Sequence, residues 1–189
     1  MYEACKNGDK DTVINLIQAG FDLNTSFAAF EPWLLYSYGV PAFPAIHVVC
    51  LYGNANLIPI LVEAGCDVNT LGYFGRTPLF EACEEAYASV VALLLEHGAD
   101  VNAKNKHGET VMHRILRIEN RINCFTEEYD AAKSASRRDI LSILVEWGID
   151  LNVVDENRGE LVIDLAHRSE KYGRNGLTQL LIDAGCSIF

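Results

Sequence analysis

The chain has 189 residues, of which half are hydrophobic and 22% are charged, and its formal net charge is −11 at pH 7. This composition is typical of a single globular domain rather than a disordered chain, and the excess of acidic residues argues against nucleic acid as a partner. Because no apolar run could span a bilayer and the N-terminus lacks a secretory signal pattern, we expect a cytoplasmic protein that binds no membrane and keeps its six cysteines reduced.

The negative charge is concentrated in the first half of the chain. Residues 1–102 contain 3 Lys/Arg and 12 Asp/Glu, whereas residues 103–189 contain 12 and 14. The first half therefore has a net charge of −9 and the second half of −2. Such a field can attract a partner with a basic surface, although general solubility explains the same charge.

One short pattern ends five segments of the chain. It reads LIQAGFDLN at 16–24 and returns as LVEAGCDVN at 61–69, LLEHGADVN at 94–102, LVEWGIDLN at 144–152 and LIDAGCSIF at 181–189. The unit from Thr70 to Asn102 contains 33 residues without an insertion. Self-similarity of this kind indicates a repeat protein in which each unit is one supersecondary element.

The unit at 70–102 predicts a pair of helices. Thr77 is suited to cap the first helix and Pro78 to its first position, where a missing N–H costs nothing. Gly98 is suited to end the second helix in a left-handed conformation, and Asp100 leads into a turn in which short polar side chains bond the local backbone. The buried side of the second helix is predicted to contain Val90, Val91, Leu94 and Leu95.

These segments resemble the ankyrin-repeat family, whose 33-residue unit contains T-P-L-H-x-A. The segment GRTPLFEAC (75–83) matches best, although Phe80 replaces the family histidine; His47 and His113 hold that position in the second and fourth repeats, and Asp164 in the divergent fifth. The resemblance implies an all-α repeat solenoid with one domain over 1–189, built of five ankyrin repeats that each have a helix-turn-helix and a hairpin arm. The expected repeats span approximately 1–24, 25–69, 70–102, 103–152 and 153–189.

Two of the repeats are expected to carry insertions. The first lies between Asn24 and Pro44, and its aromatic rings either anchor a partner or cover the edge of the first repeat. The second, at about 119–136, is either one continuous helix capped by Thr126 or a mobile loop. The aromatic residues of the first insertion are Phe27, Phe30, Trp33, Tyr36, Tyr38 and Phe43.

The sequence offers little support for catalysis, a metal site or a cofactor. Five of the six cysteines occupy repeat positions where a thiol packs as a small hydrophobe, and there is no C-x-x-C pair; Cys124, in the second insertion, is the exception. The histidines at the family position are expected to bond turn backbone. Glu81, Glu84 and Glu85 resemble acid–base residues, but the repeat places them on a solvated helix face without a pocket. We therefore predict no catalytic residues, no metal and no cofactor.

The family resemblance implies that the chain binds another protein through arm tips and the groove-facing side of the first helices. We expect it to be a monomer when unbound and its partner to have a basic surface, which aromatic residues would anchor and acidic residues would orient. The predicted partner-binding residues are Trp33, Tyr36, Tyr38, Tyr52, Tyr73, Phe74, Arg76, Glu81, Glu84, Glu85, Arg114 and Arg117.

Two roles fit such a module. It is an adaptor that bridges partners, or an inhibitor of one partner, including the immunity type that neutralises a toxin. The alternative is the recognition domain of a larger multidomain enzyme, because Met1 falls inside the first helix of the first repeat.

Overall fold

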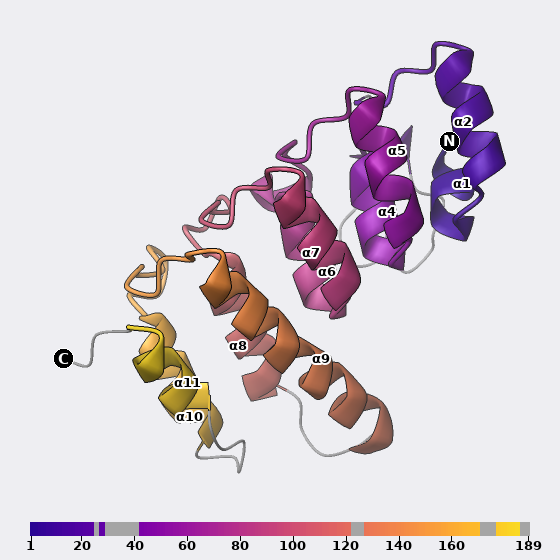
Figure 1. The fold of residues 1–189 in the computed structure, drawn as a ribbon. Coiled ribbons are helices and arrows are strands. Elements are labelled where there is room, and N and C mark those ends of the chain that lie inside the picture. The colour runs from indigo at the N-terminus through magenta and orange to yellow at the C-terminus, as the bar shows by residue number, and fades with distance from the viewer. Residues whose placement is uncertain (25–26, 29–41, 122–126, 171–176, 186–189) are drawn as a thin grey trace. The chain divides into compact units, whose positions relative to one another are not determined.

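A computed structural model describes residues 1–24, 27–28, 42–121, 127–170 and 177–185. The chain divides into two compact units, Met1–Asp100 (unit 1) and Val101–Phe189 (unit 2). Within each unit the described helices come in pairs (Figure 1). The pairs of unit 1 are α1 (Tyr2–Asn7) with α2 (Lys10–Gln18), α4 (Ala45–Tyr52) with α5 (Ile58–Glu63), and α6 (Pro78–Glu85) with α7 (Ala88–Glu96). Those of unit 2 are α8 (Val111–Arg121) with α9 (Glu127–Glu146), and α10 (Val162–Glu170) with α11 (Leu177–Asp183).

The first helices of unit 1 form one layer and the second helices another (Figure 1). Helix α4 packs between α1 and α6, and α7 packs against both α6 and α5. Between α2 and α4, the short strands β1 (Phe27–Ala28) and β2 (Ala42–Phe43) pair antiparallel, with Phe27 opposite Phe43. Two 3₁₀ turns, η1 (Ala55–Leu57) and η2 (Tyr73–Gly75), precede α5 and α6.

Local sequence explains the α6–α7 pair. Helix α6 begins at Pro78, as predicted, and Thr77 takes the extended backbone of an N-cap, but its hydroxyl makes no capping hydrogen bond. Gly98 has a φ of +88°, the left-handed conformation that favours glycine. The four residues predicted to form the buried face of α7 are at most 1% exposed: Val90, Val91, Leu94 and Leu95.

The Asp-x-Asn that follows each of the first four helix pairs has two separate roles. The aspartate organises its own turn, since Asp67 Oδ1 accepts from the Asn69 N–H at 2.8 Å. The asparagine reaches the following turn: Asn69 Nδ2 donates to the Gly98 carbonyl at 3.1 Å, and Asn69 Oδ1 accepts from the Asp100 N–H at 2.8 Å. In unit 2, Asn102 makes the same two contacts with Gly148 and Asp150. Successive turns are therefore joined by side-chain amides.

In unit 2, α10 packs against α8 and α11, and α8 also contacts α9. Helix α9 is continuous over 20 residues, in agreement with the helical prediction for this stretch, while Thr126 lies outside the described residues. The core includes Met112, Ile115, Leu116, Leu144 and Leu165.

The outer face of α11 is polar only in part. Gln179 and Asp183 are exposed and joined by a 2.7 Å hydrogen bond, whereas Thr178 is only 6% exposed. Among the described residues, no helix is long and apolar enough to cross a membrane.

Candidate partner-binding surface

The arm before α6 is held in place by a buried histidine of α4. His47 is fully buried, and its Nε2 lies 3.0 Å from the carbonyl oxygen of Thr70. A β-carbon at Gly72 would lie 2.7 Å from His47 Cε1, so only glycine fits where the arm crosses the ring. The histidine therefore fixes the start of the arm, as expected for a ring that bonds turn backbone.

Burial sets the protonation state of His47. Desolvation lowers its pKa to about 4, against the opposing effect of the hydrogen bond to Thr70, so the ring is neutral at pH 7. Because a carbonyl oxygen only accepts, Nε2 carries the proton and Nδ1 is the bare acceptor. That Nδ1 is buried without a hydrogen-bond partner among the described residues.

The arm ends in a pair of aromatic rings. The centroids of Tyr73 and Phe74 lie 4.0 Å apart in an edge-to-face arrangement, and the Arg76 guanidinium lies 5.7 Å from the Phe74 centroid. Phe74 has a φ of +58°, which is strained for a side chain of this size. Both rings are partly exposed, and the neighbouring Leu71 is 65% exposed. We call Leu71, Tyr73 and Phe74 the apolar tip.

The polar residues beside the apolar tip are less accessible than the sequence suggested. Arg76 is 8% exposed and pairs with Glu84 across 3.0 Å. Glu81 is also 8% exposed, so its predicted position on a solvated face is wrong. Burial raises the pKa of the Cys50 thiol, and the negative charge of Glu81 adds to this effect. Glu84 and Glu85 are partly exposed.

Tyr52 and Phe43 contact other side chains of unit 1. Tyr52 is partly exposed; its hydroxyl lies 3.0 Å from that of Tyr2, and Lys6 Nζ lies 5.6 Å from the Tyr52 ring centroid. Phe43 is 5% exposed and its ring centroid lies 6.2 Å from that of His47, so this ring of the first insertion packs against α4 of the second repeat. The predicted anchors Trp33, Tyr36 and Tyr38 lie outside the described residues.

Arg117 belongs to the interior of unit 2. It is 7% exposed and forms ion pairs with Glu109, Asp155 and Glu160, the last at 2.9 Å. This position differs from the predicted groove surface, because the guanidinium is desolvated and surrounded by carboxylates of two successive arms. Arg114, on the same helix, is partly exposed.

The arginine network also controls ionisation. Burial alone would raise the pKa of Asp155 and of Glu160, but this effect is outweighed by the hydrogen bonds and charge of Arg117. The backbone N–H groups of Asn157 and Arg158 add to the lowering at Asp155, and Arg168 adds to it at Glu160. The pKa of both carboxyl groups is therefore lowered. These residues stay charged and paired at neutral pH, which stabilises the two arms of unit 2.

The described cysteines are poor nucleophiles. Cys5, Cys50, Cys66 and Cys83 are free and buried, as their repeat positions predict. Desolvation raises the pKa of Cys5 to about 12 and that of Cys66 to about 11, so these thiols are neutral at physiological pH. Within the described residues no three His, Cys, Asp or Glu side chains are grouped as metal ligands, and Cys124 and Cys186 lie outside that part.

The sequence also matches a family model. The model described as ankyrin repeats (3 copies) matches residues 1–105, more than half of the chain. The chain belongs to the ankyrin-repeat family. Ankyrin repeats generally mediate binding between proteins, and the matched region contains the helix pairs α1–α2, α4–α5 and α6–α7 of this ankyrin-repeat protein. A search of curated proteins gave no match.

Sequence reasoning missed the arginine network and the degree of burial beside the apolar tip. The partners of Arg117 lie 8, 38 and 43 positions away, a spacing that no helical or turn pattern connects. Glu109 lies in the arm before α8, and Asp155 and Glu160 lie in the next arm, before α10. Acidic residues in two successive arms are the one signal in the sequence that points to a shared cation.

Proposed function

We propose that this ankyrin-repeat chain is a protein-binding module without catalytic activity, and that the apolar tip and the adjacent side of α6 form its interaction surface. The observation that carries this proposal is a partly exposed aromatic pair on an arm whose base is fixed by His47. Aromatic side chains on a rigid support bind with little loss of conformational entropy. The module has five repeats, in which α8–α9 and α10–α11 add two pairs to the matched three.

The partner of this module has a basic surface. Unit 1 contains only three Lys/Arg residues. Arg76 is buried against Glu84, and Lys6 lies over the Tyr52 ring. The carboxylates of unit 1 therefore dominate the electrostatic field around the apolar tip. Aromatic anchoring with electrostatic steering suits either an adaptor or an inhibitor of the immunity type.

The test compares two arm variants in partner capture. Tyr73→Ser/Phe74→Gly removes both rings, and glycine relieves the positive φ at position 74, so the fold should remain intact. The matched control, Lys106→Ser/His107→Ser, changes the same two positions of the next arm. We expect a protein captured from the source cells by the wild type to be lost only with the first variant, with circular dichroism unchanged.

The outcome has three readings. Equal capture by both variants would refute the apolar tip as the binding surface. Loss of a captured enzyme's activity at one equivalent of the chain would identify an inhibitor. Simultaneous capture of two partners, each dependent on a different surface, would identify an adaptor.

A further inference from the structure

A second surface of unit 1 lies between its outer helices. A hollow of about 260 Å³ separates α2 from α5. It is lined by Ile14, Ile17 and Gln18 of α2, by Ile60 and Glu63 of α5, and by Ala64, which caps the end of α5. All six lie in or directly after second helices, so this α2–α5 groove is distinct from the apolar tip.

The groove follows from how unit 1 is packed. The first pair is held through α1, which packs against α4, while α5 packs against α7. On each helix the lining residues have the i, i+3, i+4 spacing of a single face. Ile14, Ile17 and Ile60 are only partly buried, which leaves their apolar surface accessible between the two helices.

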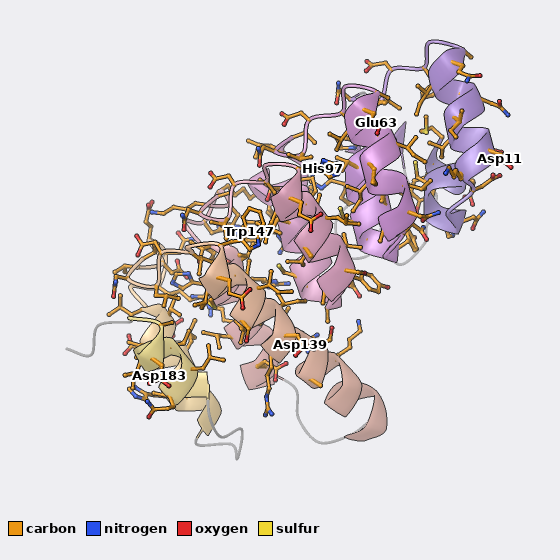
Figure 2. All side chains as sticks on the ribbon, viewed as in Figure 1. Asp11, Glu63, His97, Asp139, Trp147 and Asp183 are labelled. Carbon is orange, nitrogen blue, oxygen red and sulfur yellow. The ribbon has the colours of Figure 1, made fainter. Side chains whose placement is uncertain are left out.

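The two helices of the groove carry a net charge of −1, because α2 contains Lys10 and Asp11 and α5 contains Glu63. Glu63 lines the groove and is exposed, and Figure 2 shows Glu63 on α5 and Asp11 on α2. Between Lys10 and Arg76 the sequence contains no lysine or arginine. Neither α2 nor α5 has a basic residue in its last turn to offset the negative end of its helix dipole.

We propose that the α2–α5 groove binds a basic amphipathic helix of a partner protein. Its apolar face would place one large or two smaller side chains in the hollow, since a cavity of about 150 Å³ already accepts benzene. Lysine or arginine beside that face would meet Glu63. A second copy of this chain is a poor occupant, because it would bring another strongly acidic unit 1 to the same surface.

This proposal concerns a different surface from the apolar tip and does not depend on it. A chain with both surfaces can hold two partners at once, one on the arm side and one on the second-helix side. The groove therefore favours the adaptor role over simple occlusion of one enzyme.

The test uses designed peptides and the full chain. A fluorescein-labelled helical peptide has leucines on one face and lysines beside them, and a second peptide has glutamate in place of each lysine. Fluorescence anisotropy at physiological ionic strength should show binding of the basic peptide only. Ile60→Ser/Glu63→Lys should weaken that binding by about tenfold or more, because it removes one buried apolar side chain and reverses one charge.

The repeat supplies a matched control for this experiment. Ile143 and Glu146 of α9 stand at the same positions before the helix-ending glycine as Ile60 and Glu63. Ile143→Ser/Glu146→Lys should leave peptide affinity unchanged, as should Tyr73→Ser/Phe74→Gly. Should the double variant of the groove lose its circular dichroism signal, Glu63→Gln alone should still weaken binding severalfold.

Four results would overturn the proposal. They are no binding of the basic peptide, equal binding of the acidic peptide, equal weakening by the α9 control, and a dimer of the wild-type chain that Ile60→Ser/Glu63→Lys dissociates. The last would make a second copy the occupant.

Discussion

The arm of unit 1 and the arms of unit 2 are stabilised by different chemistry. The arm before α6 packs through the Tyr73 and Phe74 rings and the Arg76–Glu84 ion pair, and it leaves Leu71 65% exposed. In unit 2, Asn105 Nδ2 donates to Glu109 at 2.7 Å, and Glu109 shares Arg117 with Asp155. The same repeat geometry can therefore be stabilised by internal polar pairing or left with an apolar surface available to a partner.

A second difference concerns the Thr-x-x-His pair at the start of the first helix. In unit 2 the pair is complete: Thr110 Oγ1 lies 2.9 Å from His113 Nδ1, and His113 Nε2 lies 3.3 Å from the Glu160 carbonyl. In unit 1 the two halves fall in different repeats. His47 follows Pro44 rather than threonine, and Thr77 precedes Phe80, so the Thr77 hydroxyl is buried without a partner among the described residues.

Removal of Arg117 should have the largest effect, because its ion pairs stabilise the arms of unit 2. Arg117→Met should lower the free energy of unfolding by about 3–5 kcal/mol, because it leaves buried carboxylates without their cation. Arg168→Met, at a half-exposed side chain paired with Glu160, should cost at most about 1 kcal/mol. Urea unfolding followed by Trp147 fluorescence, in a Trp33→Phe background, measures both. Equal losses would show that the network has no special role in unit 2.

The next effect is a pH dependence that arises in unit 1. The pKa of His47 falls from 6.5 in the unfolded chain to about 4 in the fold, so between these values the unfolded state binds more protons. Stability from this group is complete above pH 6.5 and should fall by about 3 kcal/mol as the pH drops to 4.

The measurement is the urea midpoint between pH 7 and 4. His47→Gln, which keeps a donor for the Thr70 carbonyl, should remove most of the dependence, while a smaller part remains because burial also lowers the pKa of His113. His97→Gln, at the exposed end of α7, should behave as the wild type. An unchanged slope in His47→Gln would contradict the buried, neutral ring.

Two threonine substitutions should change the free energy of unfolding by smaller amounts and in opposite directions. Thr77→Val replaces a partnerless buried hydroxyl by a methyl group and should stabilise the fold by up to about 1 kcal/mol. Thr110→Val removes the bond to His113 and should destabilise it by about 1–2 kcal/mol. Chemical denaturation of both variants decides the matter, and shifts of the same sign would show that the split Thr-x-x-His pair has no energetic consequence.

Much of the fold was predictable because it depends on short-range pattern. Pro78 begins α6 and Gly98 takes its positive φ as expected, and the spacing of Val90, Val91, Leu94 and Leu95 identified the buried side of α7. These features arise from steric limits on single residues and from helical periodicity. Both are readable within one repeat.

The candidate surface was less predictable because burial of a polar residue depends on a distant partner. Nothing local distinguishes Arg117, which is buried among carboxylates, from Arg114, which is partly exposed. Glu81 likewise has the position of a groove residue but is only 8% exposed. The α2–α5 groove was not predicted either, since it results from how two helices of different repeats meet.

The asparagine amides that join successive turns have a consequence for the history of such chains. Asn69 and Asn102 each present the same two atoms to the same two backbone groups of the next turn. Deleting residues 70–102 would bring Asn69 to the register that Asn102 occupies before Gly148 and Asp150. A gene can therefore lose or gain a whole repeat at this turn while the asparagine hydrogen bonds between successive turns are preserved.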